Sequence, residues 1–369
     1  MSAQLGVAGD RSRVERCRAL LADLHLDAVL VTAASDVRYL SGFRGDDTAL
    51  LIGADLALIV TDARYWEQVR EEVDGFELVE ATGGDLVADS VLAGSGRLGP
   101  AYALGFQGGD VTYAAYRRLR RRHAGPLRDV GARVTRLRVR KDEAELEVMR
   151  RAAAVTEAAL EAVVAEGLSG RTEAEVAWRV QEEFHRRGAE GEAFPSIVAA
   201  GGHAAQAHAI PGRRVIAPGE LVIMDIGARV DGYCSDITRT FAAGREPDEE
   251  QRRVYEVVLA AQLAGVAAVR AGASGRGGVD EATRAVIDAA GYGARFGHGT
   301  GHGVGLDVHE APALGRLRGD LLEAGMVCTV EPGIYIEDVV GVRIEDTVVV
   351  TPDGCERLTV SSRELRVVG

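Results

Sequence analysis

The chain has 369 residues, of which 47% are hydrophobic and 27% are charged, so it is long enough for two globular domains with a buried core. Its formal net charge of −13 argues against partners such as nucleic acid or an anionic membrane, and no uncharged apolar stretch is long enough to span a bilayer. Four widely separated cysteines and a polar start favour a reducing, cytoplasmic location.

The first part of the chain alternates helical and strand patterns. An amphipathic helix is expected over 11–24, a short apolar strand over 27–32, two strands around a glycine-containing turn over 49–62, and a helix over 63–73. This order predicts a small α/β domain, and we find no catalytic constellation in it.

A basic stretch, residues 117–141, carries eleven arginines or lysines and a single acidic residue, Asp129. A nucleic-acid patch is one interpretation. A solvated helix face followed by a linker strand is preferred, because no aromatic residues interleave with the charges. The charge reverses near 138–142, so we place the domain boundary there, with an N-terminal domain at 1–138 and a second domain at 139–369.

The second domain begins with a long helical pattern from residue 142, and Thr172 with Glu175 predicts a capping box that opens another helix. Two further helices are expected over 247–270 and 280–290. The segments PGELVIMD (218–225) and AGMVCTVE (324–331) resemble each other, since each places a carboxylate six residues after a glycine. This faint repeat suggests a duplicated half-domain that brings carboxylates from both copies to one centre.

The first copy contains a predicted hairpin, in which Asp231 and Gly232 form a two-residue turn. That turn puts Asp225 on the same face as Asp236 and diagonal to it. Two carboxylates this close require a metal or protonation. In the second copy Glu331 ends an apolar run, while Glu345 lies within another, two residues from Arg343. We expect Arg343 to serve as a partner of Glu345.

The stretch GHGTGHGVG (297–305) has glycine at every second position, with His298 and His302 between. It fits neither a dinucleotide-binding nor a phosphate-loop motif. A helix is disfavoured, because each glycine costs about 1 kcal/mol there. Alternate glycines instead suit a strand-like backbone that passes close to a bulky neighbour, with the histidines directed into a site.

Several of these residues and their contexts resemble those of a known family. The ordered set Asp225, Asp236, His302, Glu331 and Glu345 resembles the ligand signature of the pita-bread metallopeptidases, which include methionine aminopeptidase, aminopeptidase P and prolidase. The contexts MDIGARVDGYCSDITRTF, GHGTGHGVGLDVHE, VEPGIYI and GVRIEDTVVV agree, as do the spacings of 11 between the aspartates and 14 between the glutamates. The resemblance covers about 140–360.

The resemblance also implies a fold. YLSGF (39–43) and TDARYWEQ (61–68) resemble the additional N-terminal domain of aminopeptidase P, prolidase and creatinase. The expected fold class is therefore α+β. In it, an N-terminal α/β creatinase-like domain would be followed by a C-terminal pita-bread domain, in which duplicated ααβ halves are arranged around a curved antiparallel sheet. Creatinase itself lacks this ligand set.

Roles follow from the resemblance residue by residue. Asp225 would chelate one ion, Asp236 and Glu345 would bridge two ions, and His302 and Glu331 would bind the second. Further catalytic residues would be His208, His298, His309 and Arg343, the histidines near the substrate and the arginine as a brace, with Glu331 also shuttling a proton. Oxygen-rich ligands favour Mn²⁺, with Co²⁺, Fe²⁺ or Zn²⁺ as alternatives.

The implied activity is dinuclear hydrolysis of the bond between an N-terminal residue and proline, in short peptides with proline at the second position. An Xaa-Pro aminopeptidase is the first expectation and an Xaa-Pro dipeptidase (prolidase) the alternative. A non-catalytic binding module, or another reaction on the same centre, stays open. The resemblance also suggests a homodimer.

Overall fold

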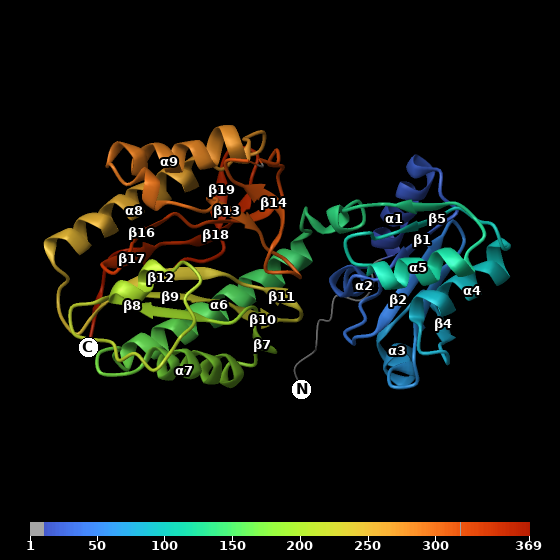
Figure 1. Ribbon diagram of the computed structural model, residues 1–369, viewed down its shortest axis with the longest axis horizontal. Helices are drawn as coiled ribbons and strands as arrows, with labels where there is room; N and C mark the ends of the chain where they lie inside the picture. The colour runs from blue at the N-terminus through green and yellow to red at the C-terminus, as the bar shows by residue number, and fades with distance from the viewer. Residues whose placement is uncertain (1–10, 318) are drawn as a thin grey trace. The chain divides into compact units, whose positions relative to one another are not determined.

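The computed structural model describes residues 11–317 and 319–369, and the chain divides into two compact units, Met1–Arg138 and Val139–Gly369 (Figure 1). Each unit has its own apolar core. No helix in the described part of the chain is both long and apolar enough to cross a membrane.

The N-terminal unit is built on a six-stranded sheet in the order β4-β3-β2-β1-β5-β6. Its strands are β1 (Ala28–Val31), β2 (Thr48–Gly53), β3 (Ala57–Thr61), β4 (Glu77–Glu80), β5 (Leu104–Phe106) and β6 (Leu127–Asp129). Its helices are α1 (Arg11–Leu24), α2 (Ala34–Ser41), α3 (Trp66–Glu72), α4 (Leu86–Leu98), α5 (Tyr113–Arg122) and the 3₁₀ turn η1 (Thr135–Arg138). The central strands β1 and β2 are buried along their whole length, which explains their largely apolar sequences. The helix predicted over 11–24 and the two strands over 49–62 are confirmed.

The first part of the basic stretch forms helix α5, which is amphipathic. Its buried residues are Ala115 and Leu119, while the arginines of the last turn are exposed. Cationic side chains at a helix C-terminus are favoured by the helix dipole. The preferred interpretation of these arginines as a solvated helix face is confirmed for the helical part.

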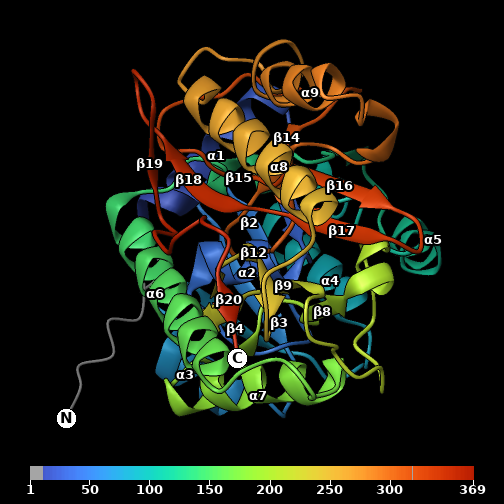
Figure 2. The same cartoon turned by 90° about the vertical axis from the view of Figure 1, so that its left-hand side faces the viewer.

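The C-terminal unit contains two helix pairs that cover opposite sides of its strands, as both views show (Figures 1 and 2). The first pair is α6 (Glu143–Ala165) with α7 (Glu173–Arg186), and the second is α8 (Glu249–Ala268) with α9 (Asp280–Ala289). Capping boxes begin α6, α7 and α8, including the predicted pair Thr172 and Glu175. Short helical turns complete the unit: η2 (Gly201–Ala205), η3 (Gly275–Val279) and η4 (Gly293–Arg295).

The strands of this unit form two larger sheets, β20-β12-β9-β8 and β14-β13-β15-β18-β19, and two small ones, β11-β10-β7 and β16-β17. Apart from the parallel pair β12–β20, the strand pairs are antiparallel. The strand bounds are β7 (Gly191–Glu192), β8 (Ile197–Ala200), β9 (Leu221–Ile226), β10 (Ala228–Val230), β11 (Tyr233–Cys234), β12 (Ile237–Ala243), β13 (Gly301–Gly303), β14 (Glu310–Leu314), β15 (Val327–Val330), β16 (Gly333–Ile336), β17 (Val340–Arg343), β18 (Asp346–Val350), β19 (Cys355–Arg357) and β20 (Val367–Val368). The two similar sequence segments become β9 and β15, each after its own helix pair, as a duplicated half-domain requires.

The predicted hairpin is present. Asp231 and Gly232 have φ angles of 46° and 82°, the left-handed values that a two-residue turn of this kind needs. The same register continues from β10–β11 into β9–β12, where Thr238 lies opposite Asp225. Asp236 is therefore diagonal to Asp225, and the predicted register is confirmed.

Candidate metal centre and active site

All of the polar residues selected from the sequence line one cavity of about 510 Å³ within the C-terminal unit. Most of its remaining wall is apolar, with Phe194, Pro195, Ile197 and Val308 among the lining residues. A cavity with an apolar wall and a few convergent polar groups is typical of a small-ligand site. The residues brought together are His208, Asp225, Asp236, His298, His302, His309, Glu331, Arg343 and Glu345.

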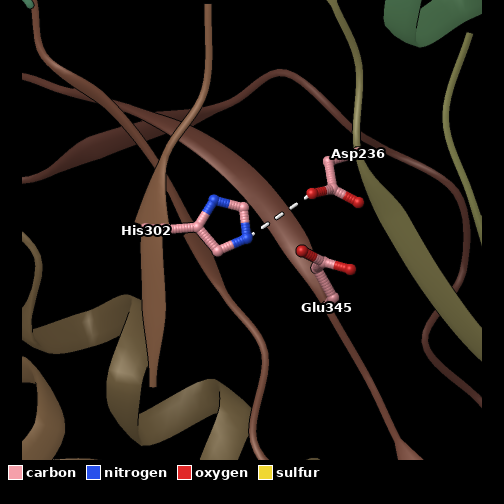
Figure 3. A group of neighbouring side chains, drawn as sticks. All are labelled: Asp236, His302 and Glu345. Carbon is pink, nitrogen blue, oxygen red and sulfur yellow. Dashed lines mark ion pairs between the residues drawn. The ribbon is translucent and has the colours of Figure 1, made fainter. Parts of the chain in front are cut away.

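Strand ends from both halves deliver the acidic side chains. Asp225 is near the end of β9, Asp236 immediately precedes β12, Glu331 follows β15, and Glu345 lies between β17 and β18. Figure 3 shows His302, on β13, with its ring directed toward Asp236 and Glu345, and one ligand atom from each of these three residues lies within 4.8 Å of the others. Three potential ligands from three separate segments of the chain therefore meet at one point.

His302 is held in the form that binds metals. Its Nδ1–H donates to the carbonyl oxygen of Gly303 at 3.1 Å, so Nε2 presents a lone pair to the acids. That Nε2 lies 3.3 Å from Oε1 of Glu331 and 3.7 Å from Oδ2 of Asp236. Burial lowers the pKa of His302, which keeps the ring neutral.

The buried carboxyl groups lie close together, and a bound cation would offset their repulsion. Burial, and then the neighbouring Glu345, raise the pKa of Asp236 well above its ordinary value, and burial followed by Glu331 does the same for Glu345. Burial also raises the pKa of Glu331. In the described structure Oδ1 of Asp225 is buried without a hydrogen-bond partner. Hard oxygen donors with unsatisfied charge fit a divalent ion, which would hold the carboxylates ionised.

Arg343 does not partner Glu345 as expected. Its Nη2 donates to Oδ2 of Asp225 at 2.6 Å, and its Nε donates to Oγ1 of Thr238 at 3.2 Å. Thr238 in turn donates to Oε2 of Glu345 at 2.7 Å. The reason is the strand register: Thr238 sits opposite Asp225 and so lies between the arginine and the glutamate.

His298 differs from His302 in its contacts. Its Nδ1–H donates to the carbonyl oxygen of Gly299 at 2.8 Å, and its Nε2 accepts from the hydroxyl of Tyr335 at 2.9 Å. The same hydroxyl accepts from Nη1 of Arg343 at 2.8 Å. Burial lowers the pKa of His298 and raises that of Tyr335, so the imidazole stays neutral and the phenol keeps its proton.

Three further residues of the site, Tyr335, Thr238 and Thr329, were not expected from the sequence. Tyr335 lies in an apolar strand, and a buried tyrosine hydroxyl needs a hydrogen-bond partner, which was the available signal. Thr329 accepts a bond from the backbone N–H of His302 at 3.1 Å and donates to Oε1 of Glu331 at 3.3 Å. Threonine is common in strands, so neither threonine stood out in the sequence.

The two remaining histidines face the accessible part of the cavity. His208 and His309 are both exposed. The ring of His309 stands edge-on to that of His302, with centroids 4.3 Å apart. Both imidazoles are therefore reachable by a peptide that enters the cavity.

The glycines of 297–305 allow close strand packing, as expected. A Cβ atom on Gly301 would collide with the carbonyl oxygen of Thr329, and one on Gly303 would collide with that of Ala311. Strand β13 thus lies tightly between β14 and β15, which brings His302 to the acids.

Comparisons with known proteins agree with this architecture. The family model described as "Metallopeptidase family M24" matches residues 147–352, and "Creatinase/Prolidase N-terminal domain" matches 13–140. An Xaa-Pro dipeptidase of Pyrococcus furiosus is 34% identical over 358 residues, covering 96% of this chain and 99% of the relative.

Solved structures extend the similarity to the whole fold. An Xaa-Pro dipeptidase from Bacillus anthracis has a TM-score of 0.92 at 37% identity, covering 97% of this chain and 99% of that one. An X-Pro aminopeptidase from Thermotoga maritima has a TM-score of 0.87 at 35% identity, covering 96% of this chain and 100% of that one. The predicted fold class, a pita-bread domain after a creatinase-like domain, is confirmed.

Proposed function

This chain belongs to metallopeptidase family M24, and we propose on that premise that it is an Xaa-Pro dipeptidase, which hydrolyses dipeptides whose second residue is proline. As a member of that family it is a peptidase, and so a hydrolase. The observation that carries the proposal is the meeting of four carboxylates and His302 in one cavity. The sequence placed aminopeptidase first, but the dipeptidase relatives from Pyrococcus and Bacillus anthracis favour the reverse order.

We assign the metal ligands to Asp225, Asp236, His302, Glu331 and Glu345, with two divalent ions as the complete cofactor. When bound, such ions lower the pKa of a water molecule and polarise the peptide carbonyl. Hard oxygen ligands with one imidazole support Mn²⁺ first, ahead of Co²⁺, Fe²⁺ or Zn²⁺.

The chain's own residues supply proton transfer and binding. Glu331, oriented by Thr329, is the group we assign to move a proton to the leaving nitrogen. A peptide nitrogen that belongs to proline carries no hydrogen, so it must receive this proton to leave as the amine. His208 and His309 bind the peptide. Arg343 holds Asp225 and, through Tyr335, fixes the ring of His298.

One observation favours Xaa-Pro aminopeptidase as a second candidate. Among the described residues that line the cavity, Arg343 is the only arginine or lysine, and its side chain is 4% exposed. Its nitrogens already donate to Asp225, Thr238, Tyr335 and the carbonyl oxygen of Ala207. A dipeptide's terminal carboxylate would therefore meet imidazoles rather than a fixed permanent cation, so longer peptides are also admissible.

A substrate comparison separates these functions. The Mn²⁺-loaded protein is assayed with an Xaa-Pro dipeptide, an Xaa-Pro-Yaa tripeptide and a matched Xaa-Ala dipeptide, each with and without EDTA. Dipeptide-only, proline-dependent and EDTA-sensitive cleavage supports the proposal, whereas efficient tripeptide cleavage selects the aminopeptidase. Cleavage of neither proline substrate overturns both, and elemental analysis without a bound transition metal would then favour a binding module.

We further propose that the protein acts as a cytoplasmic homodimer and that its domains meet between residues 138 and 139. Family membership supports the dimer and the composition supports the compartment. Light scattering during size-exclusion chromatography tests the first, and a mass near that of one 39.0 kDa chain would refute it.

A further inference from the structure

A buried ion pair lies beside the proposed centre and has no role in the chemistry described above. The Nζ atom of Lys141 is 2.6 Å from Oε1 of Glu310, and each side chain is 1% exposed. Of the 43 lysines and arginines in the chain, Lys141 is the only lysine. Burying two charges requires a large desolvation free energy. A buried ion pair next to a functional site is therefore a candidate for a functional role.

The backbone of Lys141 is firmly fixed within the C-terminal unit. Its N–H donates to the carbonyl oxygen of Gly325 at 2.8 Å, and Arg140 forms a β-bridge with Met326. The next residue, Asp142, caps helix α6. Lys141 is thus held between the start of a long helix and the segment that leads into β15.

Glu310 occupies the other end of the pair. It begins strand β14, follows His309 directly, and lies opposite Gly303 in the β13–β14 ladder, next to an irregularity between His302 and Gly303. A Cβ atom on Gly305 would come within 2.5 Å of Oε1 of Glu310. The last glycine of GHGTGHGVG therefore leaves room for this carboxylate.

The small number of acceptors at this position explains why a lysine, and not an arginine, occupies it. Nζ of Lys141 has two described acceptors, Glu310 and the carbonyl oxygen of Val139 at 3.3 Å. A guanidinium is larger and carries five N–H donors, which a dry pocket of this kind would have to satisfy. A compact point charge with three donors matches the space better.

We propose that Lys141 is a positioning residue for peptide hydrolysis: its ion pair with Glu310 holds the turn over 303–310 so that the imidazole of His309 faces the cavity beside His302. This rests on the proposed function only in that His309 contacts the peptide. The pair acts through His309 and makes no contact with the substrate itself.

A double-mutant cycle tests this coupling in the Mn²⁺-loaded full-length enzyme. Lys141→Met should lower kcat/KM for an Xaa-Pro dipeptide by about 100-fold, because displacing a contacting group by about 1 Å has that effect. In the His309→Ala background the same change should cost less than about 3-fold, since residues that act as one unit are non-additive. An equal cost in both backgrounds overturns the proposal. Lys141→Arg keeps the charge and should recover part of the loss.

Two further measurements separate positioning from general damage. Bound Mn²⁺ per chain should be unchanged in Lys141→Met, and loss of metal would show that the pair serves the ligands instead. The matched control is Arg138→Met, which breaks the buried pair with Asp36 in the N-terminal unit, where the side chains are 4% and 1% exposed. In Arg138→Met, replacing His309 by alanine should still lower kcat/KM by the same factor as in the wild type.

A crystal structure of Lys141→Met decides the proposal independently of turnover. The centroid separation of 4.3 Å between His302 and His309 should be lost in the variant. If the rings keep that separation, the positioning role is wrong even for an active enzyme. If the wild type cleaves no proline peptide while the rings separate in the variant, the proposed function fails and the positioning of His309 stands.

Discussion

Removing the metal should make the stability of the protein decrease as the pH rises. Asp236 and Glu345 have raised pKa values in the folded state, through burial first and then through their acidic neighbours. Without a metal the folded state therefore binds more protons than the unfolded state. The contribution of these two carboxyl groups to stability is fully present below the ordinary carboxyl pKa of about 4. It is lost as the pH rises through their raised pKa values in the folded state.

The size of the effect follows from the geometry. Ligand atoms of the two acids lie within 4.8 Å of each other. Two unit charges at about 4.8 Å repel by about 3.5 kcal/mol at an effective dielectric constant of about 20. A metal at about 100 times its Kd stabilises by about 2.7 kcal/mol, which is of the same order. For a domain of about 150–250 residues this corresponds to a Tm increase of about 5–10 °C.

Thermal unfolding at pH 5, 6, 7 and 8, with EDTA or with excess Mn²⁺, measures this directly. The Tm of the EDTA-treated protein should fall across the series, and the Mn²⁺-induced increase should be largest at pH 8, because fewer protons compete for the carboxylates. The matched variant Glu345→Gln should show a shallower fall with EDTA. A Tm in EDTA that rises from pH 5 to 8, or a Mn²⁺ shift equal at every pH, would refute the reasoning.

Three further predictions concern single side chains. His302→Ala should lose bound metal by elemental analysis, whereas His298→Ala should keep it and lose turnover; identical behaviour of the two variants would contradict their separate roles. Tyr335→Phe should keep the metal but reduce kcat by about 10-fold or more, since it removes a group that orients a residue of the site; an unchanged kcat would show that the hydroxyl is dispensable. Gly301→Ala should lower the free energy of unfolding by about 1–3 kcal/mol, because its Cβ collides with the carbonyl oxygen of Thr329. A Tm equal to that of the wild type would contradict that close approach.

Local features of the fold could be predicted because they depend on neighbouring residues. The turn at Asp231 and Gly232 fixes the register of its hairpin, so the diagonal relation between Asp225 and Asp236 follows from the sequence. The capping box at Thr172 marks the start of α7 in the same way. Glu331 and Glu345 also stand out in the sequence, because the first ends an apolar run and the second lies within another, although their role as ligands depended on the family resemblance.

The partners of these side chains could not be predicted, because they come from separate strands, which can lie as far apart in the chain as those of Asp225 and Arg343. Arg343 lies two residues from Glu345, yet it pairs with Asp225 on another strand. Tyr335 reaches His298, and Thr238 reaches Glu345, only because separate segments of the chain pack together.

The sequence by itself determined several of the helices and strands and the hairpin register and, together with the family resemblance, the set of residues to be brought together. The tertiary structure alone decided which nitrogen of each histidine faces which neighbour, and it paired the single lysine with Glu310. The reason is physical: turn and capping preferences act within a few residues, whereas hydrogen bonds and ion pairs in a buried site depend on how separate strands pack.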